Sequence, residues 1–183
     1  MIVMRLVAGS LALAIAGCAE ARPDPLPGYE PASSEQRAAV ASVVSAYYDL
    51  RNRAAITGDI APLYAAHPAL AKDEDKRSGV NVEAFFVERM RALSVTRVTV
   101  EIEASEPLKV YVNETRAVAY VHGRETWDLP PGTGQTIGEI FVRLDLHLAG
   151  SGWLIDRTDE LKLGERMPPT PRLAAPDPDA ESD

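Results

Sequence analysis

The apolar residues change their spacing once along this chain, near Val95, and this change limits the folds that the chain can adopt. Before Val95 they recur at three- and four-residue steps, which is typical of amphipathic helices. After Val95 apolar and polar residues alternate, most cleanly from Ile140 to Leu148, which is typical of strands with one buried face. Helices followed by a run of strands predict an α+β fold, with three helices packed on one face of a curved antiparallel sheet of about five strands.

The helical part has clear boundaries. Ser33 and Gln36 have the spacing of a capping box, and Gly58 is expected to end the long helix that follows them. Asp59 is expected to cap a short second helix that ends near residue 68. A polar loop at 72–78 and a third helix at 82–93 follow it.

Turn residues divide the alternating part into strands. Pro and Gly between residues 130 and 134 indicate a hairpin loop, and Gly150 with Gly152 indicates the last turn. The expected strands lie at 97–103, 108–112, 117–127, 140–148 and 153–157.

The first residues have the pattern of a secretory signal peptide, predicted to span residues 1–17. Arg5 precedes an uncharged run from Leu6 to Ala16, which is too short to cross a bilayer as a helix. Ile15, Ala16, Gly17 and Cys18 resemble the bacterial lipobox. The resemblance implies cleavage between Gly17 and Cys18 and acylation of the Cys18 thiol, while the alternative is an ordinary signal peptide with a chance cysteine.

This resemblance places the protein in the cell envelope, lipid-anchored on the extracytoplasmic side of the membrane. The outer membrane is favoured if one exists, because residue 19 is Ala rather than Asp. Nine of the 14 prolines lie in two flanks, which predicts a Pro-rich tether at 18–32 and a disordered acidic tail at 165–183. One domain, at residues 33–164, remains between them.

Composition excludes several functions. The net charge of −8 argues against nucleic acid as a partner, because binding phosphates needs a basic surface. A single cysteine excludes an internal disulfide framework and a cysteine-rich zinc site. The three histidines are too scattered for a metal motif, so we expect no metal and no cofactor.

Four segments between residues 34 and 160 carry a family resemblance: Thr57-Gly58-Asp59, Leu63-Tyr64-Ala65-Ala66, 79–85 and Gly152-Trp153-Leu154-Ile155. With the order of helices and strands, they resemble the nuclear transport factor 2-like superfamily, which includes SnoaL-like and ketosteroid isomerase-like proteins. The resemblance implies a cone-like sheet whose concave face and helices enclose a pocket.

Two functions fit this resemblance. The first is a binding or interaction module for a small apolar ligand or an envelope partner, with an expected homodimer contact through the exposed sheet face. The side chains expected to line its pocket are Tyr48, Tyr64, Phe86, His122 and Trp127.

The alternative is a lyase or isomerase acting on a small apolar carbonyl compound. The isomerases of the superfamily use a tyrosine on the first helix, an aspartate base and a second acid on a strand. The positions that match are Tyr48 or Tyr47 for the tyrosine, Asp75 or Asp73 for the base and Glu139 for the acid, with His122 as a further polar candidate. Because Asp73 and Asp75 lie in a highly charged segment, the binding module is the leading hypothesis.

Overall fold

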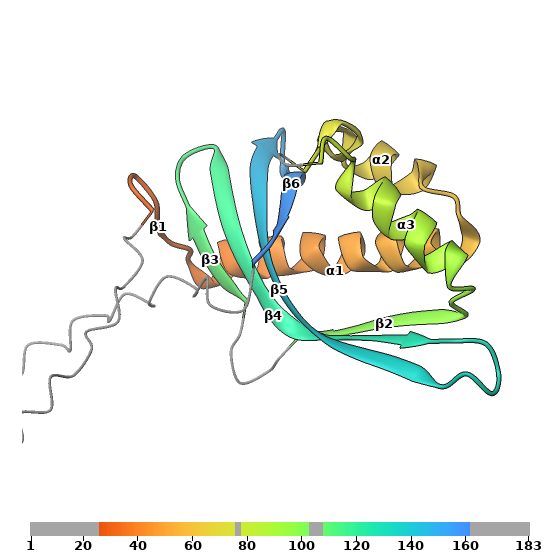
Figure 1. The fold of residues 1–183 in the computed structure, drawn as a ribbon. Helices are drawn as coiled ribbons and strands as arrows, with labels where there is room; N and C mark the ends of the chain where they lie inside the picture. The colour runs from red at the N-terminus through yellow and green to blue at the C-terminus, as the bar shows by residue number, and fades with distance from the viewer. Residues whose placement is uncertain (1–25, 76–77, 103–107, 162–183) are drawn as a thin grey trace, which may run out of the picture.

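The computed structural model describes residues 26–75, 78–102 and 108–161, and it has the predicted α+β fold (Figure 1). Three α-helices pack on an antiparallel sheet, in the order expected from the sequence. The helices are α1 (Ser34–Thr57), α2 (Ala61–Ala66) and α3 (Val82–Ala92), with a 3-10 helix, η1 (Pro68–Lys72), after α2.

The predicted boundaries of α1 are confirmed. The Gln36 N–H donates to the Ser33 hydroxyl at 3.2 Å, and the Ser33 N–H donates to the Gln36 side chain at 2.9 Å, which completes the capping box. At the other end Gly58 adopts a φ of 79° and donates its N–H to the Ala54 carbonyl. That left-handed conformation favours glycine and ends the helix.

The sheet is built around two long strands. Its strands are β1 (Glu30–Pro31), β2 (Arg97–Ile102), β3 (Lys109–Val112), β4 (Arg116–Asp128), β5 (Gln135–Ala149) and β6 (Gly152–Glu160). The order is β1-β3-β4-β5-β6, and β2 also pairs with β4.

Strands β2 and β3 lie end to end along the same edge of β4. Ile102, the last residue of β2, is opposite Gly123 of β4. A side chain at Gly123 would collide with the backbone carbonyl of Glu101, so glycine allows the two backbones to approach closely there.

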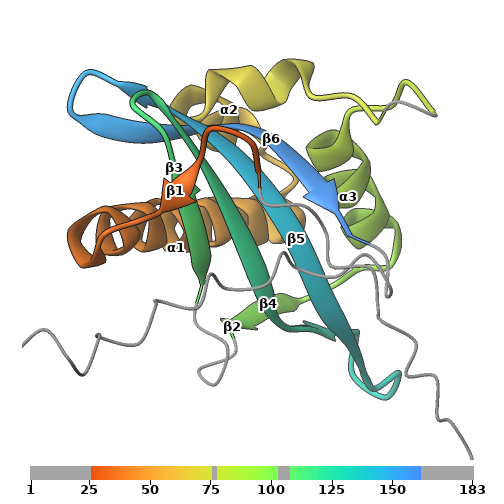
Figure 2. The same ribbon diagram turned by 90° about the vertical axis from the view of Figure 1, so that its left-hand side faces the viewer.

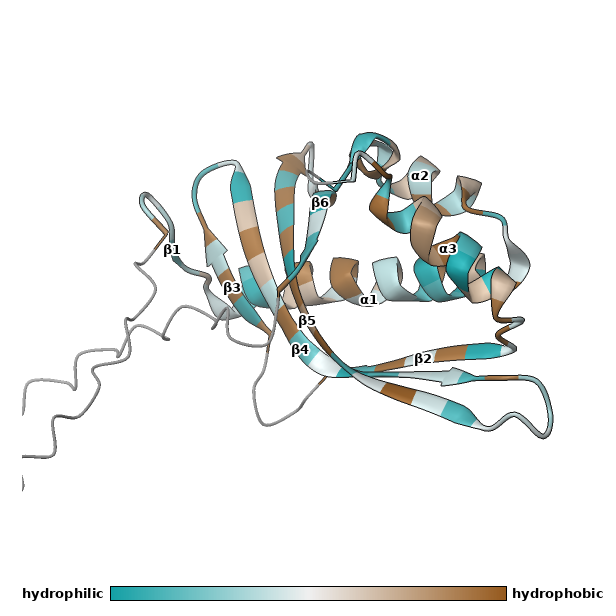
Figure 3. Ribbon diagram, in the orientation of Figure 1, coloured by the Kyte–Doolittle hydropathy of each residue, from teal (hydrophilic) through white to brown (hydrophobic). Residues whose placement is uncertain are grey.

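The helices lie on one side of the curved sheet. Strands β4 and β5 bend along their length in Figure 1, and α1 crosses behind the sheet in Figure 2. Apolar and polar residues alternate along β5 in Figure 3, so its apolar side chains face α1. The largest side chains of the main core are Val40, Val44, Tyr47, Leu63, Leu70, Leu144, Leu146 and Ile155.

The outer face of the sheet, which we expected to be a subunit contact, is partly covered by the chain itself. Tyr111 and Tyr120 form a small buried cluster there with Val118. The side chains packed against this cluster are Leu26, Tyr29 and Leu161. Both ends of the described chain therefore lie against the outer face of β3 and β4.

Three details differ from the sequence expectation. Strand β5 begins at Gln135, five residues before the expected start at 140. Strand β1 forms within the segment assigned to the tether, where two residues pair with β3, a length too short to give an alternating pattern. Strand β6 continues to Glu160, three residues beyond the expected end. The predicted signal peptide, Cys18 and the acidic tail from residue 165 lie outside the described residues. Among those described, no helix is long and apolar enough to cross a membrane.

Candidate functional site

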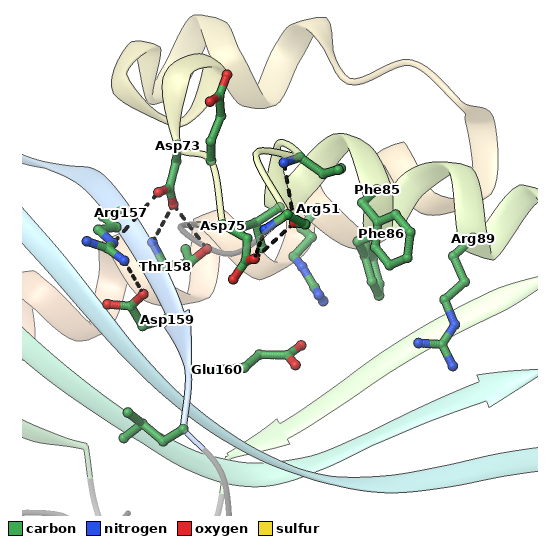
Figure 4. A pocket seen from close by; sticks show the side chains of 15 residues that line it. Arg51, Asp73, Asp75, Phe85, Phe86, Arg89, Arg157, Thr158, Asp159 and Glu160 are labelled. Carbon is green, nitrogen blue, oxygen red and sulfur yellow. Dashed lines mark hydrogen bonds and ion pairs between the residues drawn. The ribbon is translucent and has the colours of Figure 1, made fainter.

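A pocket of about 560 Å³ opens between residues 73–75 and 78–80, α3 and the end of β6 (Figure 4). This volume is within the range of small-molecule sites. The lining residues are Arg51, Asp73, Glu74, Asp75, Ser78, Val80, Val82, Phe85, Phe86, Arg89, Arg157, Thr158, Asp159, Glu160 and Leu161.

Arg51 lies at the floor of the pocket and joins two buried carboxylates. Its Nε donates to Glu83 Oε2 at 3.2 Å, and its Nη1 donates to Glu125 Oε1 at 2.7 Å. The three residues come from α1, α3 and β4, and all are buried. Because an uncompensated buried charge is costly, this ion pairing ties the two helices to the sheet.

Neutral donors complete this network. The Tyr47 hydroxyl donates to Glu83 Oε1 at 2.6 Å, and the Thr158 hydroxyl donates to the same oxygen at 3.2 Å. The Trp127 ring N–H donates to Glu125 Oε2 at 2.8 Å. We call Tyr47, Arg51, Glu83 and Glu125 the buried network.

The electrostatics of the network keep its donors protonated. Burial, reinforced by Glu83, raises the pKa of Tyr47 well above its ordinary value, so the hydroxyl remains a donor. Burial alone would lower the pKa of Arg51, but Tyr47, Glu83 and Glu125 raise it overall. The guanidinium therefore stays charged at every pH at which the protein is folded.

Apolar side chains form the α3 side of the pocket. The Arg51 guanidinium carbon lies 3.3 Å from the centre of the Phe86 ring, a cation–π contact that holds both side chains in place. Phe85 is 55% exposed and Val80 is 43% exposed at the pocket mouth. An apolar group of a bound molecule would cover these two side chains.

On the opposite wall, two polar groups have no partner among the described residues. The Tyr48 hydroxyl is buried, 6% of the residue being exposed, and makes no hydrogen bond. Glu160, on the edge strand β6, makes no hydrogen bond or ion pair within the described ranges. Both residues line a smaller cavity of about 30 Å³, which shares Arg51, Val82, Thr158 and Glu160 with the larger pocket.

We call Tyr48 and Glu160 the open pair. Burial raises the pKa of Tyr48 above its ordinary value, Arg51 opposes the shift, and Glu125, Glu83 and Glu160 reinforce it, so the hydroxyl is protonated. The pair therefore offers one neutral hydroxyl and one carboxylate to the same space.

The loop before α3 is fixed to β6 by Asp73. Its Oδ2 accepts from the Thr158 N–H at 2.8 Å. Burial raises the pKa of Asp73, although the hydrogen bond from Thr158 opposes the shift. Arg157 lies nearby and pairs with Asp159 at 2.5 Å.

Negative charge dominates the pocket. Three arginines and five acidic residues line it: Arg51, Arg89, Arg157, Asp73, Glu74, Asp75, Asp159 and Glu160. Arg51 is already paired to Glu83 and Glu125, two further carboxylates at the floor. The field within the pocket favours positive groups.

The structure brings some of the predicted site residues together and separates others. Phe86 and Asp75 line the large pocket, and Tyr48 lines the small one. Tyr64 donates to Asn81 at 2.8 Å, on the α2 side of the loop. Trp127 supports Glu125 from β4 without lining either cavity.

His122 lies on the other face of the sheet. Its neighbours Ala119 and Val121 belong to the main core, and strand alternation places His122 on the same side as Tyr120, facing away from the helices. Its Nε2 lies 2.6 Å from Glu139, which is 56% exposed. His122 and Glu139 are therefore remote from the pocket.

The sequence interpretation did not include the buried charged residues. A signal for them exists, because Arg51 follows Tyr47 by four positions and Glu83 precedes Phe86 by three. Each therefore lies on the buried face of its helix. Glu160 has no comparable signal, since it follows the predicted end of the last strand.

The two carboxylates at the floor of the pocket are fully engaged. Glu83 and Glu125 already accept hydrogen bonds from Arg51, Tyr47, Thr158 and Trp127, so neither is an unengaged base. Within the part of the chain that the structure describes, no group of three His, Cys, Asp or Glu side chains is arranged to hold a metal ion.

Comparisons with known proteins identify no family. No family model matches the chain, and no curated protein matches it. Among solved structures, Bd1075 of Bdellovibrio bacteriovorus is similar with a TM-score of 0.44 and 11% identity. The similarity covers 71% of this chain and 44% of the Bd1075 chain, so this chain spans less than half of that protein.

Proposed function

We propose that this domain is a binding module for a small amphipathic molecule, held on the extracytoplasmic side of a bacterial membrane by a lipid on Cys18. The pocket between α3, residues 73–75 and 78–80, and β6 is the binding site. The observation that carries the proposal is a pocket of about 560 Å³ lined by Glu160, Phe85 and Val80, with the unpartnered Tyr48 in the small cavity that adjoins it.

The pocket favours an amphipathic ligand over a purely apolar one. Its polar wall needs hydrogen-bond partners, while its mouth exposes aromatic and aliphatic surface. A ligand that satisfies both walls removes a buried unpartnered hydroxyl and covers exposed apolar area, and both changes favour binding.

Binding is a better account than isomerase chemistry, because the predicted bases are engaged: Asp73 accepts from the Thr158 N–H and Asp75 from the Ser78 N–H. Glu160, which has no partner among the described residues, is solvent-exposed, whereas a base for this chemistry needs a buried site. An isomerase base needs an accessible lone pair beside the substrate. Glu83, the carboxylate closest to Tyr47, accepts three hydrogen bonds, and His122 lies on the far face of the sheet.

We also infer membership of the nuclear transport factor 2-like superfamily. The support is the element order, in which a long helix and two short ones precede strands β2 to β6 of a curved antiparallel sheet, with the helices on one side of that sheet. A pocket between these helices and the sheet is what the resemblance implies.

The binding function is tested by titrating the ¹⁵N-labelled domain with 2-phenylethanol and recording amide shifts. We expect saturable shifts confined to residues near 78–89 and 157–161. The pocket-filling variant Val80→Trp should weaken them, while Val43→Ile, remote from the pocket, should not. Shifts that are absent, or spread evenly over the sheet, would contradict the proposal.

The anchor is tested by replacing Cys18 with Ser in the full chain and separating membrane from soluble material. We expect the variant to leave the membrane fraction, since a single hydrophobic segment of this length is not a stable span. Ser10→Ala, in the apolar run, serves as the control and should stay membrane-bound. Unchanged retention of Cys18→Ser would contradict the anchor.

A further inference from the structure

The open pair defines the polar chemistry that the pocket recognises. Tyr48 projects from α1 and Glu160 from β6, and both line the small cavity that adjoins the main pocket. In Figure 4 the Glu160 side chain extends into the pocket on the side of Arg51. A molecule that enters the main pocket therefore meets the Glu160 carboxylate, and a group that extends into the adjoining cavity of about 30 Å³ comes close to Tyr48.

The register of the sheet places Glu160 on the face that packs against the helices. Glu160 is opposite Val142 of β5, and Thr158 is opposite Leu144. Val142 and Leu144 belong to the face that packs on α1. The inward position of Glu160 is thus fixed by strand pairing and does not depend on a chosen rotamer.

The cation that lines both cavities does not neutralise Glu160. This cation, Arg51, is engaged by Glu83 and Glu125 at the floor. These three groups together carry one negative charge. Glu160, which is exposed at the end of β6, therefore faces a floor of the same sign, and this arrangement favours a ligand with a positive charge.

Arg89 lines the pocket and would favour an anionic ligand, but its exposed position weakens its attraction for an anion. Arg89 is exposed on α3, with its guanidinium 5.5 Å from the centre of the Trp127 ring. Solvent screens the exposed charges of Arg89 and Glu160 alike, whereas the net negative charge of the buried floor is screened much less. The balance of the lining favours a cation.

We propose that the ligand of this pocket is a small primary amine with an apolar body, whose ammonium group donates to Glu160 and to the Tyr48 hydroxyl oxygen. The apolar body lies against Phe86, Phe85 and Val80. This inference rests on the proposed binding function and specifies its substrate class.

Three probes of similar shape test the inference: 2-phenylethylamine, 2-phenylethanol and phenylacetate. Affinities come from amide shifts of the pocket residues at pH 7 and low salt. We expect the amine to bind about tenfold more tightly than the alcohol, as one added hydrogen bond to a charged group implies. Phenylacetate should bind most weakly.

The failures of the two proposals are distinguishable. If none of the three probes shifts the pocket residues, the binding function itself is overturned. If the alcohol binds but the amine binds no more tightly, or phenylacetate binds best, the pocket stands and the amine assignment is overturned.

Matched variants test whether the open pair causes the preference for the amine over the alcohol. Glu160→Gln should reduce the amine-to-alcohol preference to near one, while Glu88→Gln, the same change on the exposed side of α3, should keep it. Tyr48→Phe should weaken the amine several-fold. A preference that survives Glu160→Gln, or that falls equally in Glu88→Gln, would overturn the site.

Discussion

Two polar regions meet in this pocket, and they differ in how fully their groups are paired. In the buried network, Glu83 and Glu125 each accept hydrogen bonds from a cation and a neutral donor. In the open pair, neither Tyr48 nor Glu160 has a partner among the described residues. Both regions are contacted by α1, where Tyr47 and Tyr48 are consecutive.

This difference in hydrogen bonding implies different roles: the buried network stabilises the fold, and the open pair is available to a ligand. Removing one member of a saturated buried network leaves the others unpaired, which costs free energy of folding. Removing a group that already lacks a partner costs little folding free energy and changes what the pocket can bind. The predictions that follow compare the two regions on this basis.

The largest effect is expected at Arg51. Arg51→Ala leaves Glu83 and Glu125 buried without a cation, so the free energy of unfolding should fall by about 3–5 kcal/mol. Urea denaturation measures the loss. Arg53→Ala, on the exposed side of the same helix, should change it by less than about 0.5 kcal/mol. Equal losses in the two variants would show that the buried network carries no special stability.

The second-largest loss of unfolding free energy is expected at Glu83. Glu83→Gln keeps the shape of the side chain but weakens its bonds to Arg51 and Tyr47, and a loss of about 1–3 kcal/mol is expected by urea denaturation. Glu88→Gln, five residues along α3 and exposed, is the matched control. An unchanged midpoint in Glu83→Gln would mean that Glu83 is not held as an ion pair.

A pH dependence should arise beside the network, at buried His67. Its Nδ1 accepts from the Ile155 N–H at 3.2 Å, and burial lowers its pKa, an effect that Glu83 opposes. The unfolded state therefore binds the proton more readily. Stability is full above about pH 6.5 and should fall as the pH drops toward the folded pKa, by at most about 1.4 kcal/mol per pH unit.

Urea midpoints between pH 7.5 and 5 measure this slope. Tyr47 packs against the His67 ring, and Asp73, whose pKa is raised by burial, gives an opposite slope at lower pH. In His67→Gln, which keeps an acceptor for Ile155, the slope should be reduced. If the urea midpoint still falls as the pH drops in His67→Gln, another group causes the pH dependence.

The smallest effect is expected at Glu160. Glu160→Gln removes a charge that has no partner, so its unfolding free energy should change by less than about 0.5 kcal/mol. The same substitution at Glu83 is the comparison. A loss at Glu160 as large as that at Glu83 would show that Glu160 belongs to the stabilising network.

Much of the fold is predictable from local pattern, because capping residues and apolar spacing act over a few positions. Ser33, Gln36 and Gly58 bound α1 as expected. Strand β1 was missed because two residues, one of them Pro31, carry no alternation and depend on pairing with β3.

The candidate site is less predictable because its contacts are long-range. Aromatic residues such as Tyr48 and Phe86 are expected in a pocket from their type and helix face. Arg51 and its two carboxylates are separated by 32 and 74 positions, so no local pattern shows that they pair. Alternation groups His122 with Tyr120 but does not say which face of the strand is turned toward the helices.

The two consecutive tyrosines give the most direct test that the buried network stabilises the fold while the open pair binds the ligand. Tyr47→Phe and Tyr48→Phe are each measured by urea denaturation and by 2-phenylethylamine titration. We expect Tyr47→Phe to lower the unfolding free energy by about 1–2 kcal/mol with little change in affinity, because Glu83 loses a donor. Tyr48→Phe should keep its stability and bind the amine several-fold more weakly. A Tyr48→Phe variant that is destabilised and binds the amine normally would contradict the account.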